Sequence, residues 1–256
     1  MLLAVDIGNT SITLGLYKTE KLGPRWRLAS DNERTTDEYG IILIQLLERA
    51  GVSLEEVNEI AIASVVPPLT GTFERTCREY LNCAPLIVDA GTRTGIPLRY
   101  EDPKQQVGAD RVANAAAVRK MYKGPACIVD FGTATIFDAM SADGEYLGGA
   151  ISPGIGISSD ALYRRTAKLP RVEITRPPSA IGRNTVQSLQ SGLLYGYVGL
   201  VEGMVARFRA ELGPEMKTIG TGSFVELIAK ETIRIDIVEP WLALLGLMII
   251  FDLIRR

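Results

Sequence analysis

One segment of the sequence occurs twice, and this repetition is the strongest constraint on the fold. Residues 5–17 read VDIGNTSITLGLY and residues 129–140 read VDFGTATIFDAM. Each has an apolar strand ending in an aspartate, then an apolar residue, a glycine with small polar residues, and a second apolar strand, which is the pattern of a β-hairpin. Asp6 and Asp130 lie nearly half of the 256-residue chain apart. The sequence therefore predicts an internal duplication.

The order of the later elements repeats as well. Residues 59–81 read as a strand, a turn and a helix, and residues 217–231 read as a strand, a glycine turn and a helix. The alternative, a chance pair of strand–Asp–Gly turns, does not account for this shared order. Alternating strands and helices predict a mixed α/β layer structure in each half, with the two hairpin turns facing each other across a cleft.

The residues of the two hairpins indicate what such a cleft would bind. The carboxylates of Asp6 and Asp130 suit cations, and small residues beside them let backbone N–H groups approach phosphate oxygens. These small residues are Gly8, Asn9, Thr10, Gly132 and Thr133. The chain has neither a Gly-Lys-Ser/Thr phosphate loop nor a Gly-x-Gly-x-x-Gly segment. We therefore expect the hairpins themselves to hold a nucleoside triphosphate.

Composition excludes several other kinds of chemistry. The sequence contains no histidine, which removes an imidazole base, a Ser-His-Asp triad and the histidine ligands of a catalytic zinc site. A formal net charge of −2 provides no basic field, so no nucleic-acid partner is expected. The three cysteines form no Cys-x-x-Cys pair and are odd in number, which favours a reducing compartment.

Neither end of the sequence predicts a membrane segment. The first apolar stretch ends at Asp6 with no basic segment before it, unlike a signal peptide. The run WLALLGLMIIFDLI, residues 241–254, is shorter than the roughly 20 residues of a membrane span and contains Asp252. This run predicts a buried helix, and we expect a cytoplasmic protein with no membrane partner.

Five short motifs are spread along the whole chain. They are DIGNT at 6–10, GADR at 108–111, DFGTATIFD at 130–138, GGAISPG at 148–154 and GTG at 220–222. Together they resemble the type III pantothenate kinases, a family of the acetate and sugar kinase, Hsp70 and actin superfamily. The resemblance implies two duplicated ribonuclease H-like domains, with mixed sheets flanked by helices and a nucleotide cleft between them. It implies actin-like ATPase domains at 1–113 and 114–256, the second carrying a dimer interface.

The resemblance also implies a reaction. The family uses ATP to phosphorylate pantothenate to 4'-phosphopantothenate, the first step of coenzyme A biosynthesis. The implied co-substrate is ATP, the implied metals are Mg²⁺ and a monovalent cation, K⁺ or NH₄⁺, and the implied assembly is a homodimer.

Particular residues take roles by the same resemblance. The first phosphate loop comprises Asp6, Ile7, Gly8, Asn9, Thr10, Ser11, Ile12 and Thr13, with Asp6 as the ligand of Mg²⁺. The second comprises Asp130, Gly132 and Thr133, with Asp130 as the ligand of the monovalent cation. Pantothenate is expected at Tyr100, Gly108, Ala109, Asp110, Arg111 and Thr185, with Asp110 as the catalytic base. One departure from the family is Ser223. It stands directly after GTG, at the position where the family usually has a further glycine to give Gly-Thr-Gly-Gly.

The chemistry of the GADR motif agrees with these implied roles. Phosphoryl transfer needs positioning and charge neutralisation more than a strong base, so an ionised Asp110 suffices to accept the alcohol proton. Arg111 offers a planar fork that suits the carboxylate of pantothenate. The alternative is structural, because Asp110 would also serve to cap the predicted helix at residues 111–122.

A predicted helix at residues 188–208 has glycines on one face. They are Gly192, Gly196, Gly199 and Gly203, whose spacing places them together. Each costs a helix about 1 kcal/mol relative to alanine, so close approach of another backbone is expected to compensate. The glycines alone leave open whether that backbone belongs to the same domain or to a second copy. The resemblance implies the second copy, with Thr185 against the partner's pantothenate.

Two other functions stay open from the sequence. One is a kinase of this superfamily that acts on another small hydroxy compound, and the pairing of GADR with Thr185 favours pantothenate over it. The other is a non-catalytic nucleotide-binding regulator of the same fold. The presence of Asp110, Arg111 and Asp130 argues against a chain that has lost its catalytic groups.

Overall fold

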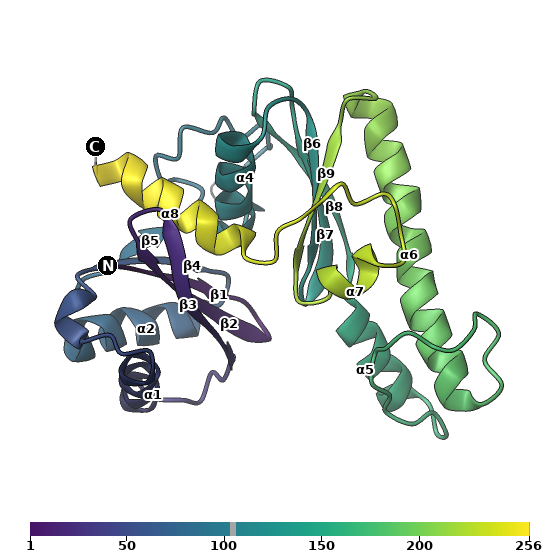
Figure 1. The fold of residues 1–256 in the computed structure, drawn as a ribbon, viewed down its shortest axis with the longest axis horizontal. Helices are drawn as coiled ribbons and strands as arrows, with labels where there is room; N and C mark the ends of the chain where they lie inside the picture. The colour runs from purple at the N-terminus through teal and green to yellow at the C-terminus, as the bar shows by residue number, and fades with distance from the viewer. Residues whose placement is uncertain (103–105, 256) are drawn as a thin grey trace. The chain divides into compact units, whose positions relative to one another are not determined.

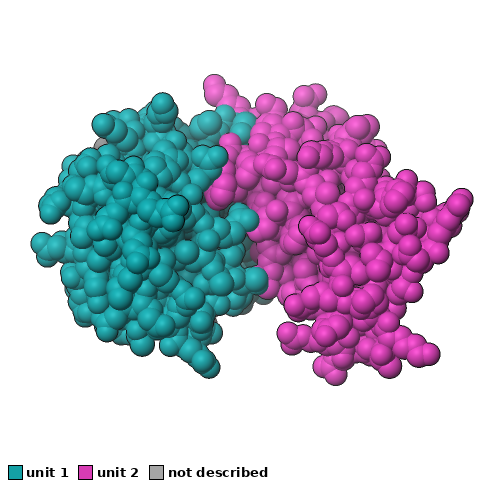
Figure 2. All heavy atoms as spheres, turned by 60° about the horizontal axis from the view of Figure 1, so that its bottom comes forward, with its two compact units in different colours: residues 1–96, 100–122, 242–256 teal, residues 97–99, 123–241 magenta. Residues whose placement is uncertain are grey.

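The chain divides into two compact units (Figure 1). The computed structural model describes residues 1–102 and 106–255. Unit 1 comprises Met1–Ile96, Tyr100–Tyr122 and Leu242–Arg256, and unit 2 comprises Pro97–Arg99 and Lys123–Trp241. Figure 2 draws unit 1 in teal and unit 2 in magenta. Each unit is built on one mixed five-stranded sheet flanked by helices, which confirms the predicted fold class.

The sheet of unit 1 is formed around a central β-hairpin. Its strand order is β3-β2-β1-β4-β5, with β1 antiparallel to β2 and parallel to β4. The strands are β1 (Leu2–Ile7), β2 (Ser11–Lys18), β3 (Lys21–Ala29), β4 (Glu59–Ser64) and β5 (Leu86–Val88). The helices are α1 (Thr36–Arg49), the short 3-10 helix η1 (Leu54–Glu56), α2 (Pro67–Tyr80), α4 (Ala109–Met121) and α8 (Leu242–Arg255). In Figure 1, α1 and α2 lie on one face of this sheet and α8 lies on the other.

The sheet of unit 2 repeats this arrangement. Its order is β10-β9-β6-β7-β8, with β6 antiparallel to β7 and parallel to β9. The strands are β6 (Ala126–Phe131), β7 (Ala134–Met140), β8 (Tyr146–Pro153), β9 (Lys217–Gly222) and β10 (Ile237–Val238). The helices are α5 (Ile155–Arg165), α6 (Thr185–Leu212) and α7 (Val225–Ala229). Strands β6 to β10 therefore correspond in order and direction to β1 to β5, as the duplication predicts.

Each unit has its own apolar core. In unit 1, alternate residues of β1 and β2 pack with Tyr39 and Leu43 of α1 and Phe73 of α2. In unit 2, Val129 and Phe131 of β6 pack with the apolar side of α6 and with α7. Burial of this apolar surface is the main stabilising term for such layers.

The C-terminal run folds as the predicted buried helix. Helix α8 buries Leu244, Leu247 and Ile250, and it lies against α4 so closely that a side chain at Gly246 would overlap the backbone of Ala113. Unit 1 therefore includes α4 beyond residue 113 together with the end of the chain, so the compact units differ from the contiguous ranges 1–113 and 114–256. Within the described residues, no helix has the length and apolarity that crossing a membrane requires.

Candidate active site

The first predicted phosphate loop is the β1–β2 hairpin of unit 1. Asp6 is half-buried and pairs with Thr13 across the hairpin. The turn closes where the Gly8 N–H donates to the Ser11 carbonyl at 3.0 Å, and a Cβ at Gly8 would lie only 3.2 Å from that oxygen. Asn9 and Thr10 are exposed at the tip, and the Thr10 carbonyl accepts the Ser30 N–H at 3.1 Å.

The hydrophobic members of this loop are part of the core. Ile7 and Ile12 have no exposed surface and pair with each other at the base of the turn. Their side chains anchor the hairpin in the core and are not exposed to a ligand.

The second predicted phosphate loop is the β6–β7 hairpin of unit 2. Asp130 is half-buried and pairs with Ile136 of β7 and Thr221 of β9. The Gly132 N–H donates to the Ala134 carbonyl at 3.0 Å. This turn is one residue shorter than the first, but an aspartate stands one residue before the end of the central strand in both hairpins.

Two glycines that sequence reasoning left without a role lie against the second hairpin. Gly154, the last residue of the GGAISPG motif, donates its N–H to the Thr133 carbonyl at 3.0 Å, and a side chain there would overlap the turn. Gly222, the last residue of GTG, has φ +91°, and its Cβ would lie 2.5 Å from Asp130 Oδ1. The sequence did contain an indication of these close contacts, because the motifs GGAISPG and GTG each end in the glycine concerned.

The GADR motif forms the start of α4 in unit 1. Gly108 is the N-cap, and Asp110 is in the first turn, where its Oδ1 accepts the Arg111 N–H at 2.8 Å. A side chain at Gly108 would overlap the Asp110 carboxylate and lie 3.2 Å from Val65. Asp110 is thus not the N-cap, although it does satisfy one N–H of the helix start, as the structural alternative expected.

The environment of Asp110 changes its acidity. Part of the side chain reaches the surface, but protein atoms surround the carboxyl group. Burial raises the pKa of Asp110, and the hydrogen bond and positive charge of Arg111 oppose this rise without cancelling it. A carboxylate with a raised pKa is a stronger base than an ordinary aspartate.

The remaining predicted pantothenate residues have different environments. Ala109 and Arg111 are buried at the start of α4, and Tyr100 is half-buried in the same unit. Thr185 is the exposed first residue of α6 in unit 2. Gly108, Ala109, Asp110 and Arg111 therefore form one continuous turn, whereas Thr185 stands on a separate element.

The carboxylates of Asp6 and Asp130 suit a metal ion that takes its remaining ligands from a bound phosphate group and water. No group of three or more His, Cys, Asp or Glu side chains gathers in a metal-binding arrangement within the described ranges. Asp6 and Asp130 each offer a carboxylate beside a turn of small residues. Mg²⁺ commonly takes one or two protein carboxylates and fills its octahedron with phosphate oxygens and water, so these residues fit such a metal.

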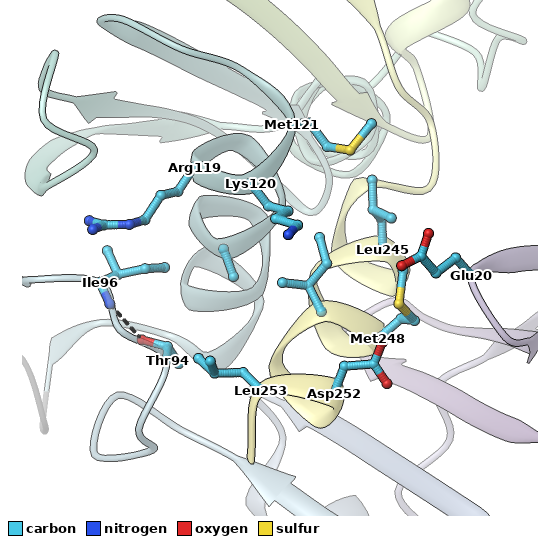
Figure 3. Close-up of a pocket in the computed structure, with 12 residues that line it drawn as sticks. Glu20, Thr94, Ile96, Arg119, Lys120, Met121, Leu245, Met248, Asp252 and Leu253 are labelled. Carbon is cyan, nitrogen blue, oxygen red and sulfur yellow. Dashed lines mark hydrogen bonds between the residues drawn. The ribbon is translucent and has the colours of Figure 1, made fainter. Parts of the chain in front are cut away.

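A separate cavity lies at the other end of α4 (Figure 3). It has a volume of about 440 Å³, and its apolar wall includes Leu245 and Met248 of α8. Arg119 and Lys120 on one side are balanced by Glu20 and Asp252. Along α4 the cavity is lined from Ala116 onward, about 9 Å along the helix from Asp110 at 1.5 Å per residue. None of the predicted site residues lines it, and its balanced charges select no class of ligand.

Solved structures with the same fold include sugar kinases. The inorganic polyphosphate/ATP-glucomannokinase of Arthrobacter sp. strain KM is 14% identical, with a TM-score of 0.50 over 98% of each chain. An ethanolamine utilization protein from Carboxydothermus hydrogenoformans is 13% identical, with a TM-score of 0.55 over 97% of this chain and 89% of the other. Two duplicated units, each with an aspartate hairpin, define the class as the acetate and sugar kinase, Hsp70 and actin fold.

Sequence comparison then identifies the family. The family model described as type III pantothenate kinase matches residues 2–207. A type III pantothenate kinase of Moorella thermoacetica is 50% identical over 98% of this chain and 99% of the relative. Another from Roseiflexus sp. (strain RS-1) is 51% identical over the full length of both. The chain belongs to the type III pantothenate kinase family, whose members are phosphotransferases.

Proposed function

We propose that this chain transfers the terminal phosphoryl group of ATP to the primary hydroxyl of pantothenate, which gives 4'-phosphopantothenate and ADP in the first step of coenzyme A biosynthesis. The observation that carries this proposal is about 50% identity over nearly the whole chain to proteins named type III pantothenate kinase. The geometry of the GADR turn and of the two hairpins supports it.

The two hairpins supply the proposed contacts to ATP and its cations. The exposed tip of the β1–β2 turn, at Asn9, would present a backbone N–H group to a phosphate oxygen. Asp6 would hold Mg²⁺, and Asp130 would hold K⁺ or NH₄⁺ beside Gly132 and Thr133. When bound, these cations would neutralise charge on the phosphates. Replacement of K⁺ and NH₄⁺ by Na⁺ in the assay tests the role of Asp130. Full activity in sodium would show that Asp130 does not hold an activating K⁺ or NH₄⁺ ion.

The GADR turn is the proposed acceptor site. The Asp110 carboxylate accepts the proton of the pantothenate hydroxyl while the hydroxyl oxygen attacks the terminal phosphorus of ATP. The bond between that phosphorus and the ADP leaving group then breaks. Arg111 binds the pantothenate carboxylate, and Tyr100 and Thr185 hold the rest of the molecule. The raised pKa of Asp110 supports its assignment as the base, because proton transfer becomes more favourable as the base strengthens.

A homodimer is the proposed assembly, and the exposed face of α6 supports it. Among the described residues, no atom outside the local helix backbone lies within 4 Å of a Cβ built at Gly192, Gly196 or Gly199. Gly192 and Gly196 border a groove that also includes Leu189 and Leu162. A second copy of α6 would bury this face and recover the helix stability that the glycines cost.

The proposed location is the cytoplasm. Cys77, Cys83 and Cys127 are free thiols, which agrees with a reducing compartment. Fractionation of the native host would test this location.

The acceptor specificity of ATP consumption tests the reaction. We expect ADP release with pantothenate to exceed the release with no acceptor, with a hexose or with a short hydroxy acid by at least about a hundredfold. Faster release with a sugar would indicate another kinase of the superfamily. ATP binding without acceptor-dependent release would indicate a regulator.

A further inference from the structure

The turn of the first hairpin is held by a residue from a different strand. Ser30 comes directly after β3, and its hydroxyl donates to the Gly8 carbonyl at 2.5 Å. Its backbone N–H donates to the Thr10 carbonyl at 3.1 Å. Ser30 therefore binds the carbonyls on both sides of Asn9, the exposed residue at the tip of the turn.

These two bonds fix the direction of a peptide plane. No described peptide bond is cis, and in a trans peptide the C=O and the N–H point in opposite directions. Because the Gly8 carbonyl points at Ser30, the Asn9 N–H in the same plane points away from Ser30. The Ser30 hydroxyl thus sets the orientation of a backbone donor in the proposed phosphate loop.

The position of Ser30 is in turn fixed by the core. The hydroxyl of Tyr39 accepts the N–H of Asp31 and donates to the Asp31 carbonyl, both at 3.1 Å. Tyr39 has no exposed surface, and its ring lies 4.7 Å from that of Phe73 between ring centres. A rigid aromatic side chain in the core therefore holds the residue next to Ser30.

We propose that Ser30, supported by Tyr39, is a positioning residue for the triphosphate of the nucleotide. Ser30 does not touch the reacting atoms; it holds the β1–β2 turn so that the Asn9 N–H is oriented for a phosphate oxygen before the nucleotide arrives. Such preorganisation lowers the cost of ordering the loop on binding. The inference rests on the proposed function, since it takes this hairpin as the phosphate loop.

Three variants test the role of the hydroxyl. Ser30→Ala removes one bond to the turn and retains the backbone N–H, so the Kd for ATP should rise about threefold to tenfold, because the ordering cost that the bond removes is at most the free energy of one hydrogen bond. The KM for pantothenate should stay within about twofold. Ser30→Thr retains a hydroxyl and should restore the ATP affinity. Tyr39→Phe should weaken ATP binding in the same direction.

A matched control removes a similar bond elsewhere in unit 1. The Thr72 hydroxyl donates to the Pro68 carbonyl of α2 at 3.2 Å in a more exposed bond, so Thr72→Ala also loses one bond from a hydroxyl to a backbone carbonyl, away from the hairpin. ATP affinity is measured by calorimetric titration in the absence of pantothenate, and each variant is also checked for thermal unfolding. Thr72→Ala should leave the Kd for ATP unchanged.

The outcomes separate this inference from the proposed function. An unchanged Kd for ATP in Ser30→Ala would overturn the inference, as would equal weakening of ATP and pantothenate binding or failure of Ser30→Thr to restore affinity. A wild-type chain that binds ATP but never phosphorylates pantothenate would contradict the proposed function. In that case the ATP titrations would still decide the role of Ser30.

Discussion

At the residue scale, Asp110 is the side chain on which the proposed chemistry depends. Replacement by asparagine keeps the size of the side chain and its ability to accept the Arg111 N–H, but removes the base. We expect Asp110→Asn to lower kcat by about 10²–10⁴-fold, with the Kd for ATP within about twofold of wild type. Steady-state kinetics and ATP titration measure the two effects. Turnover close to that of wild type would show that Asp110 is not the base.

The acidity of Asp110 predicts a pH dependence. Burial raises the pKa of this carboxyl, and only its ionised form accepts a proton. The value of kcat/KM for pantothenate should therefore fall as the pH decreases through the raised pKa, and the midpoint of this fall should lie above about 3.9, the ordinary value for aspartate.

A pH profile of kcat/KM, measured where the folded state persists by circular dichroism, checks this midpoint. The carboxyl group of pantothenate also changes its protonation with pH. Its contribution is measured separately, as the pH dependence of pantothenate binding to the Asp110→Asn variant, which lacks the Asp110 carboxyl. A midpoint at or below the ordinary aspartate value would contradict the effect of burial.

At the scale of elements, Gly222 at the end of β9 has no side chain and so leaves space for Asp130 of the second hairpin. Gly222 combines a positive φ with close approach to Asp130 Oδ1. Gly222→Ala should destabilise the fold by more than about 1 kcal/mol and should weaken activation by K⁺, because the new methyl group displaces the carboxylate. Chemical denaturation and a K⁺ titration of activity measure these effects.

Gly213 provides the control for backbone strain. It has φ +98°, yet no atom lies within 4 Å of its Cβ among the described residues, so Gly213→Ala introduces strain without contact at the site. Gly222→Ala should therefore lose K⁺ activation where Gly213→Ala retains it. Equal K⁺ responses in the two variants would show that Gly222 does not position Asp130.

Several elements of the fold follow from local sequence patterns. The strand–Asp–Gly–strand pattern predicted both hairpins, and the apolar run at residues 241–254 predicted α8. The start of α4 at GADR was expected as well. These features depend on residues close in the sequence, where alternation and turn residues determine the local structure.

The features that sequence reasoning missed depend on distant contacts. Ser30 reaches Gly8 and Thr10 from the end of another strand, and α8 packs on α4 from the far end of the chain. A serine after a strand and a glycine in an apolar helix are common, so neither indicates its partner. The roles of Gly154 and Gly222 likewise required the register of β8 and β9 beside the hairpin.

At the scale of the whole molecule, the proposed dimer predicts that two inactive chains can restore each other. If Thr185 of one copy completes the site of its partner, Asp110→Asn and Thr185→Arg chains together form one intact site per mixed dimer. Mixed dimers selected through both tags should therefore give about half of the wild-type turnover. Activity of the co-expressed chains, purified through two different tags, measures this recovery.

Separately purified variants, assayed without exchange of subunits, serve as the control and should both remain inactive. Sedimentation should give a dimer. A monomer that phosphorylates pantothenate, or mixed dimers without activity, would contradict a shared site.

The central claim is that this chain moves a phosphoryl group from ATP to pantothenate. The most direct measurement is ³¹P NMR of the reaction mixture with purified protein, ATP, Mg²⁺, K⁺ and pantothenate. Our account predicts one new phosphate monoester resonance coupled to the methylene protons of the primary carbinol, formed in equal amount with ADP and absent without pantothenate. ADP and inorganic phosphate formed without that ester, whether or not pantothenate is present, would contradict it.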